Sequence, residues 1–599
     1  MTTYGERHIY AFDLPPEDLW RAVADGDTFD RDARLPEARY RFETRAGVPP
    51  LAVAEARVGP VAFEWQEPAL EWEAPLRLAV ARRFRRGPFE RYAAEMRFLP
   101  DGAGSRIEHD VELETRGAIG ALLARPLLAY SRIGAERAYR RAENRARSGL
   151  SNGSRRGPDV AAGSIAGVAR FVDAFEALRT HTEEEPAIAA RLAALAEHAP
   201  ATYRRRLRPY ELADAWGFPR ERVVAAMLAA ARAGLLGASW TIVCPRCRMA
   251  RQAVQTLQEL GSPVDCEVCG ITFSGDFDRN VELTFALPLP LSAPHADEPR
   301  PLRPQPARQI LAQRTLAAGS MAVFNVVLQP GAYVVQVLPD RVARFTVEED
   351  AGSATLDARI EHAAVRAGAS VVRAGNVRLQ FTNQAEHDAV VRIVEAELSR
   401  GMATAAAVTA LQVFRDLFPD DAPSESAPGA IRSLTIVCAE VVGLEGIAAE
   451  FGDAHTAQLV ATAFDALREL VALGCGAIVR TAGDGLMAVF TYPREAVETA
   501  LRFGELVAPL ELRLAVHRGP CVAIRANGRL DYFGATVSHV SRLARTARAG
   551  EVLLTNALAE DDRIARLLPS GERGIVTLRG LVEPVDVLRV RPAVSAASR

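Results

Sequence analysis

The sequence contains no lysine, so all 72 of its basic side chains are arginine. It also lacks a strong net charge, because 75 acidic residues leave a balance of −3, which gives no general attraction to nucleic acid or to a membrane surface. No run of 18 apolar residues is present, and the longest candidate, 117–130, is broken by Arg125 and Pro126, so we expect no membrane partner. The first residues lack a signal-peptide pattern. Together with abundant Ala and Gly, these absences predict a cytoplasmic bacterial protein.

Cysteine is scarce, with seven residues in 599, which excludes a disulfide scaffold. Four of the seven form two CxxC pairs, each able to supply two thiolates from one tight turn. Four thiolates complete a tetrahedron around Zn²⁺ and leave no open position, so the predicted site is structural. A redox CxxC is the alternative, which the paired spacing disfavours. The predicted zinc ligands are Cys244, Cys247, Cys266 and Cys269.

The length and the 49% hydrophobic content predict a folded chain with several cores. Three polar or proline-rich stretches, at 150–159, 286–309 and 419–430, predict linkers. We therefore expect a multidomain α+β protein. Its four predicted domains are 1–149, 160–285, 310–418 and 431–592.

The pattern of 1–149 is a strand, a short helix, alternating strands and a long helix at 116–147. This order, with the opening phrase LPPEDLWRAVAD, resembles the START-like (SRPBCC) polyketide cyclase family. The resemblance implies a helix-grip fold around an apolar cavity that binds a hydrophobic small molecule. Five aromatic side chains would line that cavity or, alternatively, simply fill the core: Trp20, Trp65, Trp72, Phe89 and Tyr92.

Residues 208–236 predict two helices joined at Gly217 and Pro219, and a strand at 240–243 follows, as in a winged helix. Binding to DNA would need a basic recognition face, at which Arg220 and Arg222 only hint. The acidic run 183–185 and the overall charge argue against it. We expect no nucleic-acid partner, and a DNA-binding regulator is the least favoured function.

Residues 310–400 are rich in strands and predict a small β-sandwich without a catalytic constellation. Within it, 321–328 and 333–338 predict a hairpin, and 404–418 predict one helix that leads into the last domain. With the CPRC ribbon and the phrase DFDRNVELTF, the stretch 200–420 resembles an uncharacterised domain that precedes the catalytic domain of many bacterial nucleotide cyclases.

Residues 431–592 alternate in the order β-α-β-β-α-β, which predicts a ferredoxin-like fold. A hairpin with glycines at its turn joins the middle strands in RTAGDGLMAVF (480–490). This phrase, with AEVVG (439–443), HRG (517–519) and DYFGATVSHVSRL (531–543), is similar to the class III adenylate/guanylate cyclases. The resemblance implies a phosphorus–oxygen lyase with two Mg²⁺ or Mn²⁺ ions in each active site.

In that family, two carboxylates and a backbone carbonyl hold the ions, and these positions fall on Glu440, Asp484 and Val441. Glu440 stands where the family has Asp, and its longer side chain must retract to bind the same ions. The pair that selects adenine falls on Arg480 and Asp531, with Arg in place of Lys. Asp531 would accept from the exocyclic amine of adenine, which favours ATP over GTP.

The transition-state residues of the family fall on Arg542, which is retained, and on Ser538, which replaces Asn and offers a shorter donor. The lysine that binds the triphosphate falls on Arg579. In the family, the metal carboxylates and the purine and arginine residues come from opposite subunits, so activity implies a homodimer.

We therefore expect a signalling cyclase that converts ATP to cyclic AMP and pyrophosphate under the control of an N-terminal sensor domain. Glu440 and Ser538 motivate the alternative, a degenerate cyclase-like module that binds nucleotide or ligand without catalysis.

Overall fold

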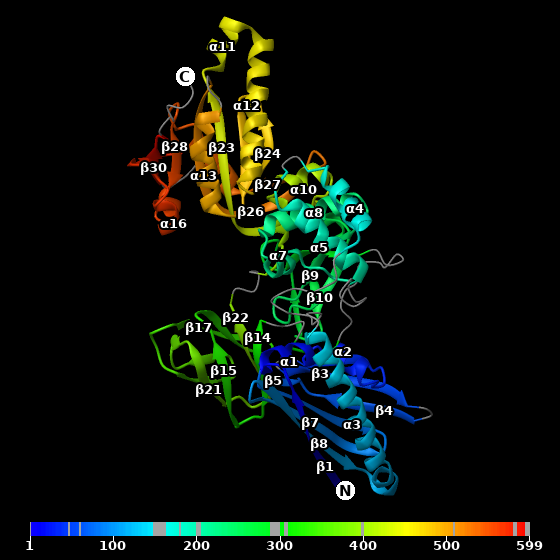
Figure 1. Ribbon diagram of the computed structural model, residues 1–599. Helices are drawn as coiled ribbons and strands as arrows, with labels where there is room; N and C mark the ends of the chain where they lie inside the picture. The colour runs from blue at the N-terminus through cyan, green and yellow to red at the C-terminus, as the bar shows by residue number, and fades with distance from the viewer. Residues whose placement is uncertain are drawn as a thin grey trace.

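The computed structural model describes residues 2–45, 48–58, 61–147, 163–178, 181–198, 205–287, 300–304, 309–396, 401–506, 510–578 and 584–592. The predicted linker 150–159 and most of 286–309 lie outside these residues. In Figure 1 the N-terminal and strand-rich regions lie side by side at one end of the molecule, the C-terminal region lies at the other end, and a helical region lies between them. Within the described ranges, no helix has the length and apolar character needed to cross a bilayer.

In the N-terminal region an antiparallel sheet packs against one long helix, α3 (Gly117–Arg147). The helix lies close to the sheet because small residues face it; a Cβ at Gly120 would overlap the carbonyl oxygen of Pro88. The other elements are β1 (Thr2–Phe12), α1 (Pro16–Val23), α2 (Gly26–Asp32), β2 (Arg39–Arg45), β3 (Val48–Val58), β4 (Val61–Glu67), β5 (Glu71–Glu73), β6 (Arg77–Arg86), β7 (Phe89–Asp101) and β8 (Gly104–Thr115).

Three of the aromatic residues predicted to line one lipophilic site fall into two separate buried clusters. Trp20 and Trp72 belong to one buried cluster and Phe89 belongs to another. Trp72 is fully buried, and its Nε1 donates to the carbonyl of Ile310 at 2.9 Å. At Trp72 the structure favours the alternative that the residue fills the core, where its buried indole N–H finds a partner in the neighbouring region.

The strand-rich region consists of two sheets that enclose an apolar cluster. The prediction of a hairpin at 321–328 and 333–338 is wrong, because β15 pairs with β21 whereas β16 pairs with β17 and β22. The connection crosses between the sheets, and the Tyr333 hydroxyl closes this corner by donating to the Gln329 carbonyl at 2.8 Å. The strands are β14 (Ile310–Leu316), β15 (Met321–Leu328), β16 (Gly331–Val337), β17 (Arg341–Glu348), β18 (Thr355–Ile360), β19 (Val365–Ala367), β20 (Val371–Arg373), β21 (Gly375–Asn383) and β22 (Ala389–Glu395).

The N-terminal sheet continues into the strand-rich region. Strand β5 pairs with β6 on one side and with β14 on the other, which makes one 13-stranded sheet. The Gln313 side chain reinforces the junction by donating to the Leu70 carbonyl at 2.7 Å. The two regions are therefore joined by backbone pairing, although they lie far apart in the sequence.

The helical region buries the helix that would recognise DNA. Helix α8 packs between α4, α5, α7 and the later helix α10, and seven of its residues are buried. Arg220 at its start pairs with Asp214 at 2.7 Å and lies over the ring of Tyr210. These contacts favour a scaffold role. The elements are α4 (Ile165–Phe175), α5 (Glu185–His198), α7 (Pro209–Trp216), α8 (Arg220–Arg232), β9 (Gly237–Val243), β10 (Ala250–Val254), the short 3₁₀ helix η1 (Leu257–Glu259), β11 (Val264–Cys266), β12 (Ile271–Phe273) and β13 (Val281–Ala286).

Residues 404–418 form two short helices, α9 (Ala405–Thr409) and α10 (Gln412–Leu417), so the prediction of one helix is wrong. The helix ends at Thr409 because Leu411 has extended backbone angles, φ −91° and ψ 132°. Buried contacts with neighbouring strands, described below, override the helical propensity of this alanine-rich stretch. We call residues 405–417 the hook.

The C-terminal region contains a sheet in the order β24-β25-β23-β26-β28-β30-β29, with β27 paired to β26. Helices α12 and α13 cover one face, whereas α14, the hook and the helical region pack on the other face in one continuous core. The elements are β23 (Gly429–Val442), α11 (Leu444–Phe451), α12 (Asp453–Leu473), β24 (Gly476–Ala482), β25 (Gly485–Phe490), α13 (Pro493–Leu506), β26 (Glu511–Ala526), β27 (Arg529–Phe533), α14 (Ala535–Ala544), β28 (Val552–Thr555), α15 (Asn556–Ala559), α16 (Asp562–Ala565), β29 (Gly571–Val576) and β30 (Val585–Val590).

Candidate functional site

The two residues predicted to contact a purine lie side by side on the C-terminal sheet. Arg480 on β24 approaches Asp531 on β27, with Nη2 and Oδ1 3.6 Å apart. The same Oδ1 accepts from the backbone N–H of Tyr532 at 2.7 Å, which fixes the carboxylate. Arg480 is half exposed and Asp531 is mostly buried, so the pair presents a polar patch at the edge of a core.

A β-bulge in β24 turns Arg480 toward this patch. Ile478 pairs with Ala488 and Arg480 pairs with Met487, so Val479 is an extra residue in the strand. Ile478 faces the core under α12, whereas Met487 belongs to the core on the opposite face. Side chains alternate along a strand, so without the bulge Arg480 would share the face of Ile478 and point away from Asp531.

The predicted metal carboxylates come from neighbouring strands. Glu440 on β23 pairs with Gly485 on β25 in the antiparallel register, and Gly485 directly follows Asp484 in the sequence. The Val441 N–H donates to the Asp484 carbonyl at 2.8 Å. Asp484 is exposed at the hairpin tip, where Gly483 adopts a φ of +58° that favours glycine. The backbone therefore brings the predicted ligands to one edge of the sheet.

Two arginines that sequence reasoning missed hold Glu440. Arg513 Nη2 lies 2.6 Å from Glu440 Oε2, and Arg545 Nε lies 3.1 Å from Oε1. The Glu440 side chain is 15% exposed, so these ion pairs are partly shielded from water. Arg513 stands directly across from Glu440 on β26. The pairing of Glu440 with Arg513 can be recognised in the sequence only once the register of β23 and β26 is known.

The donor types at this edge fit a divalent cation, but their charges are already balanced. Two carboxylates, Glu440 and Asp484, are accompanied by the guanidinium groups of Arg513 and Arg545. A cation that entered alone would meet no net negative charge and would have to break a partly buried ion pair. The site therefore fits a metal that arrives together with an anionic ligand, such as a nucleotide phosphate.

The predicted transition-state residues lie on α14. Ser538 and Arg542 are both exposed and one turn apart, while Val537, Val540 and Leu543 bury the other face of the helix. Arg545, at the end of this helix, reaches Glu440. Arg579, the predicted triphosphate ligand, lies outside the described residues.

The four predicted zinc ligands form a closed cluster. Their sulfur atoms all lie within 4.8 Å of one another, and all four residues are buried. Cys247 Sγ and Cys266 Sγ are 3.7 Å apart, which matches the edge of about 3.8 Å of a tetrahedron with Zn–S bonds of about 2.3 Å. The residues present therefore fit Zn²⁺ without rearrangement, with no position left for a substrate.

The cysteine cluster also lies at the junction of three regions. It packs in one core with Trp20 and Trp72 of the N-terminal region. The buried Arg392 Nη1 lies 3.5 Å from Cys269 Sγ, and its Nε donates to Gln313 Oε1 at 2.5 Å. Hydrogen bonds from the neighbouring thiols hold the pKa of Cys269 well below its usual range, with a smaller contribution from the charge of Arg392. This position therefore favours a thiolate, the form that binds zinc.

Comparison with known proteins identifies two parts of the chain. Residues 428–583 match the family model of the adenylate and guanylate cyclase catalytic domain, and residues 170–319 match a family of unknown function, DUF5939. Among curated proteins, none matches the chain. The first match makes the C-terminal region an adenylate/guanylate cyclase catalytic domain.

Solved structures of cyclases are similar to a part of the chain. They include adenylate cyclases from Trypanosoma brucei in their monomeric state (20% identity, covering 28% of this chain and 92% of that chain, TM-score 0.25). The adenylyl cyclase CyaB from P. aeruginosa is 19% identical over 28% of this chain and 96% of its own, with a TM-score of 0.25. The guanylate cyclase domain of RhGC from Catenaria anguillulae, in complex with GTP, is 15% identical over 27% of this chain and 98% of its own, with a TM-score of 0.25.

Proposed function

We propose that the C-terminal domain converts ATP to cyclic AMP and pyrophosphate, in a homodimer. The observation that carries this proposal is the Arg480–Asp531 pair, assembled at 3.6 Å by a bulge in a domain that matches the cyclase family. The described contacts of Asp531 use Oδ1, which leaves Oδ2 to accept from the exocyclic amine of adenine. Guanine would present a carbonyl oxygen to this carboxylate and be repelled.

Glu440, the Val441 carbonyl and Asp484 would hold the divalent ions. When bound, Mg²⁺ or Mn²⁺ supplies positive charge at the α-phosphate and activates the 3′-hydroxyl. The chain itself supplies the balance of charge: as phosphates enter, Arg513 and Arg545 exchange Glu440 for phosphate oxygens and release the carboxylate. This exchange explains why a neutral cluster can serve a dianionic or more highly charged ligand.

Ser538 and Arg542 would complete the site from a second copy of the chain, with Arg579 on the triphosphate. Both described residues are exposed on α14 and so are available to a partner surface. Arg542 would stabilise charge that develops on the phosphoryl group, and Ser538 would donate a weaker hydrogen bond beside it. The N-terminal regions would regulate this reaction.

One observation favours a second candidate, a nucleotide-binding module without catalysis. Both oxygens of the Glu440 carboxylate are paired with arginines. To bind a metal ion, this carboxylate would have to break these ion pairs. Removal of an oriented donor, as at Ser538, costs on the order of 10²–10³ in rate in other enzymes.

The deciding experiment detects products by mass spectrometry after incubation of the full chain with ATP or GTP, in Mg²⁺ and separately in Mn²⁺. Asp484→Asn tests the metal carboxylate, and Asp562→Asn, an exposed aspartate on α16, is its matched control. We expect cyclic AMP from the wild type and the control, and at least about 100-fold less from Asp484→Asn. Cyclic GMP in place of cyclic AMP would overturn the role of Asp531. Saturable nucleotide binding by dimeric protein without any product would establish the second candidate.

A further inference from the structure

We propose that the hook positions the Arg480–Asp531 pair, which we call the purine pair. Gln412 and Arg415 precede the segment 428–583 that matches the cyclase family, and they set nucleotide affinity and the preference for adenine. Both are positioning residues: Gln412 bonds the backbone two residues before Arg480, Arg415 bonds the backbone next to Asp531, and neither has a described bond to the pair itself. The inference deepens the proposed function and rests on it for the identity of the nucleotide.

Gln412 holds the bulge that turns Arg480. The backbone N–H of Ile478 donates to Gln412 Oε1 at 2.8 Å, in a buried hydrogen bond between the hook and β24. Ile478 is the last residue before the extra residue of the bulge. Loss of the Gln412 oxygen would leave a buried N–H unsatisfied at the point where the strand changes face. The bulge, and with it the direction of Arg480, therefore depends on a side chain from the preceding region.

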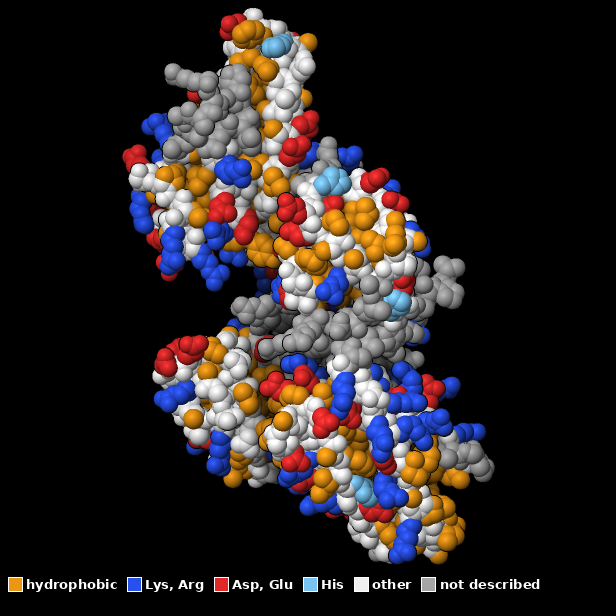
Figure 2. All heavy atoms as spheres, viewed as in Figure 1, with side chains coloured by type: hydrophobic (Ala, Val, Ile, Leu, Met, Phe, Trp, Pro, Cys, Tyr) orange, Lys and Arg blue, Asp and Glu red, His pale blue; other side chains and the backbone are white. Residues whose placement is uncertain are grey.

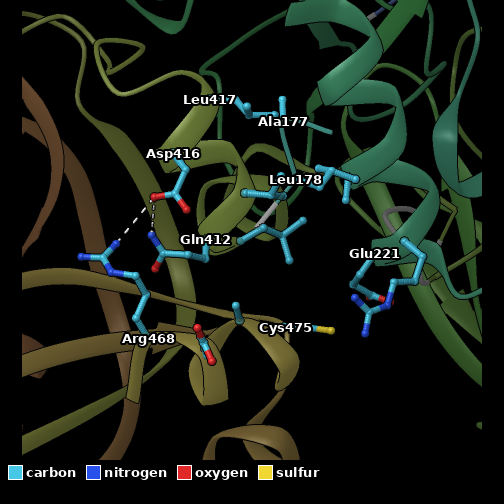
Figure 3. Close-up of a pocket in the computed structure, with 14 residues that line it drawn as sticks. Ala177, Leu178, Glu221, Gln412, Asp416, Leu417, Arg468 and Cys475 are labelled. Atoms are coloured by element: carbon cyan, nitrogen blue, oxygen red, sulfur yellow. Dashed lines mark hydrogen bonds and ion pairs between the residues drawn. The ribbon is translucent and has the colours of Figure 1, made fainter. Parts of the chain in front are cut away.

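Gln412 is itself fixed from the other side. Its Nε2 donates to Asp416 Oδ1 at 2.9 Å, and Arg468 of α12 lies 3.6 Å from the same oxygen. Figure 3 shows these three side chains along one wall of a cavity of about 80 Å³, whose other walls include Leu178 and Cys475. The cavity leaves α10 room to shift toward the helical region, and such a shift would withdraw Gln412 from β24.

Arg415 holds the other strand of the pair. Its Nη1 donates to the Leu530 carbonyl at 2.8 Å, one residue before Asp531, and its guanidinium lies over the ring of Tyr532, one residue after it. The Tyr532 hydroxyl donates to Thr409 Oγ1 at 3.1 Å, which ties the same strand to the first helix of the hook. Among the described strands β27 pairs with β26 alone, and the bond from Arg415 gives it a further anchor in the hook.

The hook therefore bonds the backbone of Ile478, two residues before Arg480, and that of Leu530, just before Asp531, and it contacts the side chain of Tyr532, just after Asp531. It also shares a continuous core with α8, through Phe414 and Met227. A displacement of the helical region is transmitted to both purine-contacting residues at once, whereas the metal carboxylates on β23 and the hairpin tip have no described bond to the hook.

The test measures fluorescence binding of N-methylanthraniloyl ATP and GTP to the full chain, together with amide hydrogen exchange at 476–482 and 529–533. Gln412→Met removes the hydrogen bonds to Ile478 and Asp416, and Arg415→Met removes the hydrogen bond to Leu530 and the contact with the Tyr532 ring. We expect the ratio of ATP to GTP affinity to fall about tenfold in each, and exchange in the strand that lost its contact to rise at least about tenfold. The double variant Gln412→Glu with Asp416→Asn reverses donor and acceptor, keeps an oxygen for Ile478, and should restore the ratio to within about threefold.

Gln336→Met on β16 is the matched control, because Gln336 is equally buried but remote from β24. Tyr532→Phe is the milder variant for a protein that tolerates no larger change. It keeps the buried ring, removes the hydroxyl that bonds Thr409 and Arg415, and should lower the ratio about threefold. Wild-type ratios and exchange rates in the hook variants, or equal changes in Gln336→Met, would overturn the proposal. If the wild type bound neither analogue, the proposed function would fail, and faster exchange in the hook variants alone would still support positioning.

Discussion

The two candidate metal sites differ in how completely the protein has built them. The cysteine cluster is buried, its sulfurs already stand at tetrahedral spacing, and Arg392 partly offsets the charge of its thiolates. At the carboxylate edge, Glu440 is paired with two arginines and Asp484 is exposed. A preformed, closed site suits an ion that stays for structural reasons, whereas a neutral, partly open site suits an ion that comes and goes with its ligand.

Basic and acidic side chains are interspersed over the face seen in Figure 2, so the difference does not arise from a general field. It arises from local pairing. In the cysteine cluster one buried arginine, Arg392, contacts one of the four ligand atoms. At the carboxylate edge two arginines pair with both oxygens of Glu440.

The largest effect is expected when the closed site is broken. Cys266→Ser removes one of four ligands and should release about one zinc ion per chain, because the remaining three cannot complete the tetrahedron. We expect the thermal unfolding midpoint of the ribbon and the regions packed on it to fall by roughly 10 °C or more. Elemental analysis and calorimetry measure the two effects. Cys521→Ser, at a buried cysteine outside the cluster, should retain the zinc; equal zinc in both variants would contradict the assignment.

Acid pH should lower the stability of the catalytic domain through His517. Burial, with a smaller contribution from His539, lowers the pKa of His517 to about 4, below its value of about 6.5 in an unfolded chain. The unfolded state therefore binds the proton more readily. The stability that His517 contributes is fully present above about pH 6.5, and it is lost as the pH falls toward 4. The free energy of unfolding of this domain should be about 2 kcal/mol lower at pH 5 than at pH 7 from this residue alone.

His109 provides the counterpart in the N-terminal region, since burial lowers its pKa to about 4 as well. Calorimetry at both pH values should show that His517→Asn reduces the acid sensitivity of the unfolding transition of the catalytic domain. His109→Asn should do the same for the unfolding transition of the N-terminal region. The exposed His455→Asn should behave as the wild type. An unchanged acid response in His517→Asn would show that its pKa is not lowered by the fold.

The smallest effect concerns the balance of charge at Glu440. Arg545→Ala removes one of the two guanidinium groups and leaves a net negative cluster, so Mn²⁺ should bind the nucleotide-free chain about three- to fivefold more tightly, as measured by electron paramagnetic resonance. Arg545 is 70% exposed, so the free energy of unfolding should change by no more than about 0.5 kcal/mol. Arg366→Ala, at a similarly exposed and paired arginine on β19, is the control. Unchanged or weaker Mn²⁺ binding in Arg545→Ala would contradict the charge argument.

The sequence predicts ligands for both candidate metal sites because each set stands in a short phrase with fixed spacing. The structure places the four cysteines in one cluster and Arg480 3.6 Å from Asp531. The approach of Arg480 to Asp531 depends on the bulge after Ile478, which no sequence motif predicts.

Contacts between distant segments could not be predicted. The pairing of Glu440 with Arg513 depends on a strand register, and the hook depends on hydrogen bonds across some 66 residues, between Gln412 and Ile478. The same limit applies to the mistaken hairpin at 321–338, whose strands alternate correctly but belong to different sheets. The local alternation of apolar and polar residues predicts where strands occur. Which strands pair with each other is decided by how their side chains are buried in the folded protein.

The proposed cyclase site is shared between two copies of the chain. Asp484→Asn and Arg542→Ala alter opposite halves of that site, so each homodimer should form little cyclic AMP. Mixing them should restore about a quarter of the wild-type activity, because half of randomly mixed dimers carry one intact site. Cyclic AMP measured by mass spectrometry after subunit exchange gives the answer. No recovery, although native mass spectrometry shows mixed dimers, would contradict a shared catalytic site.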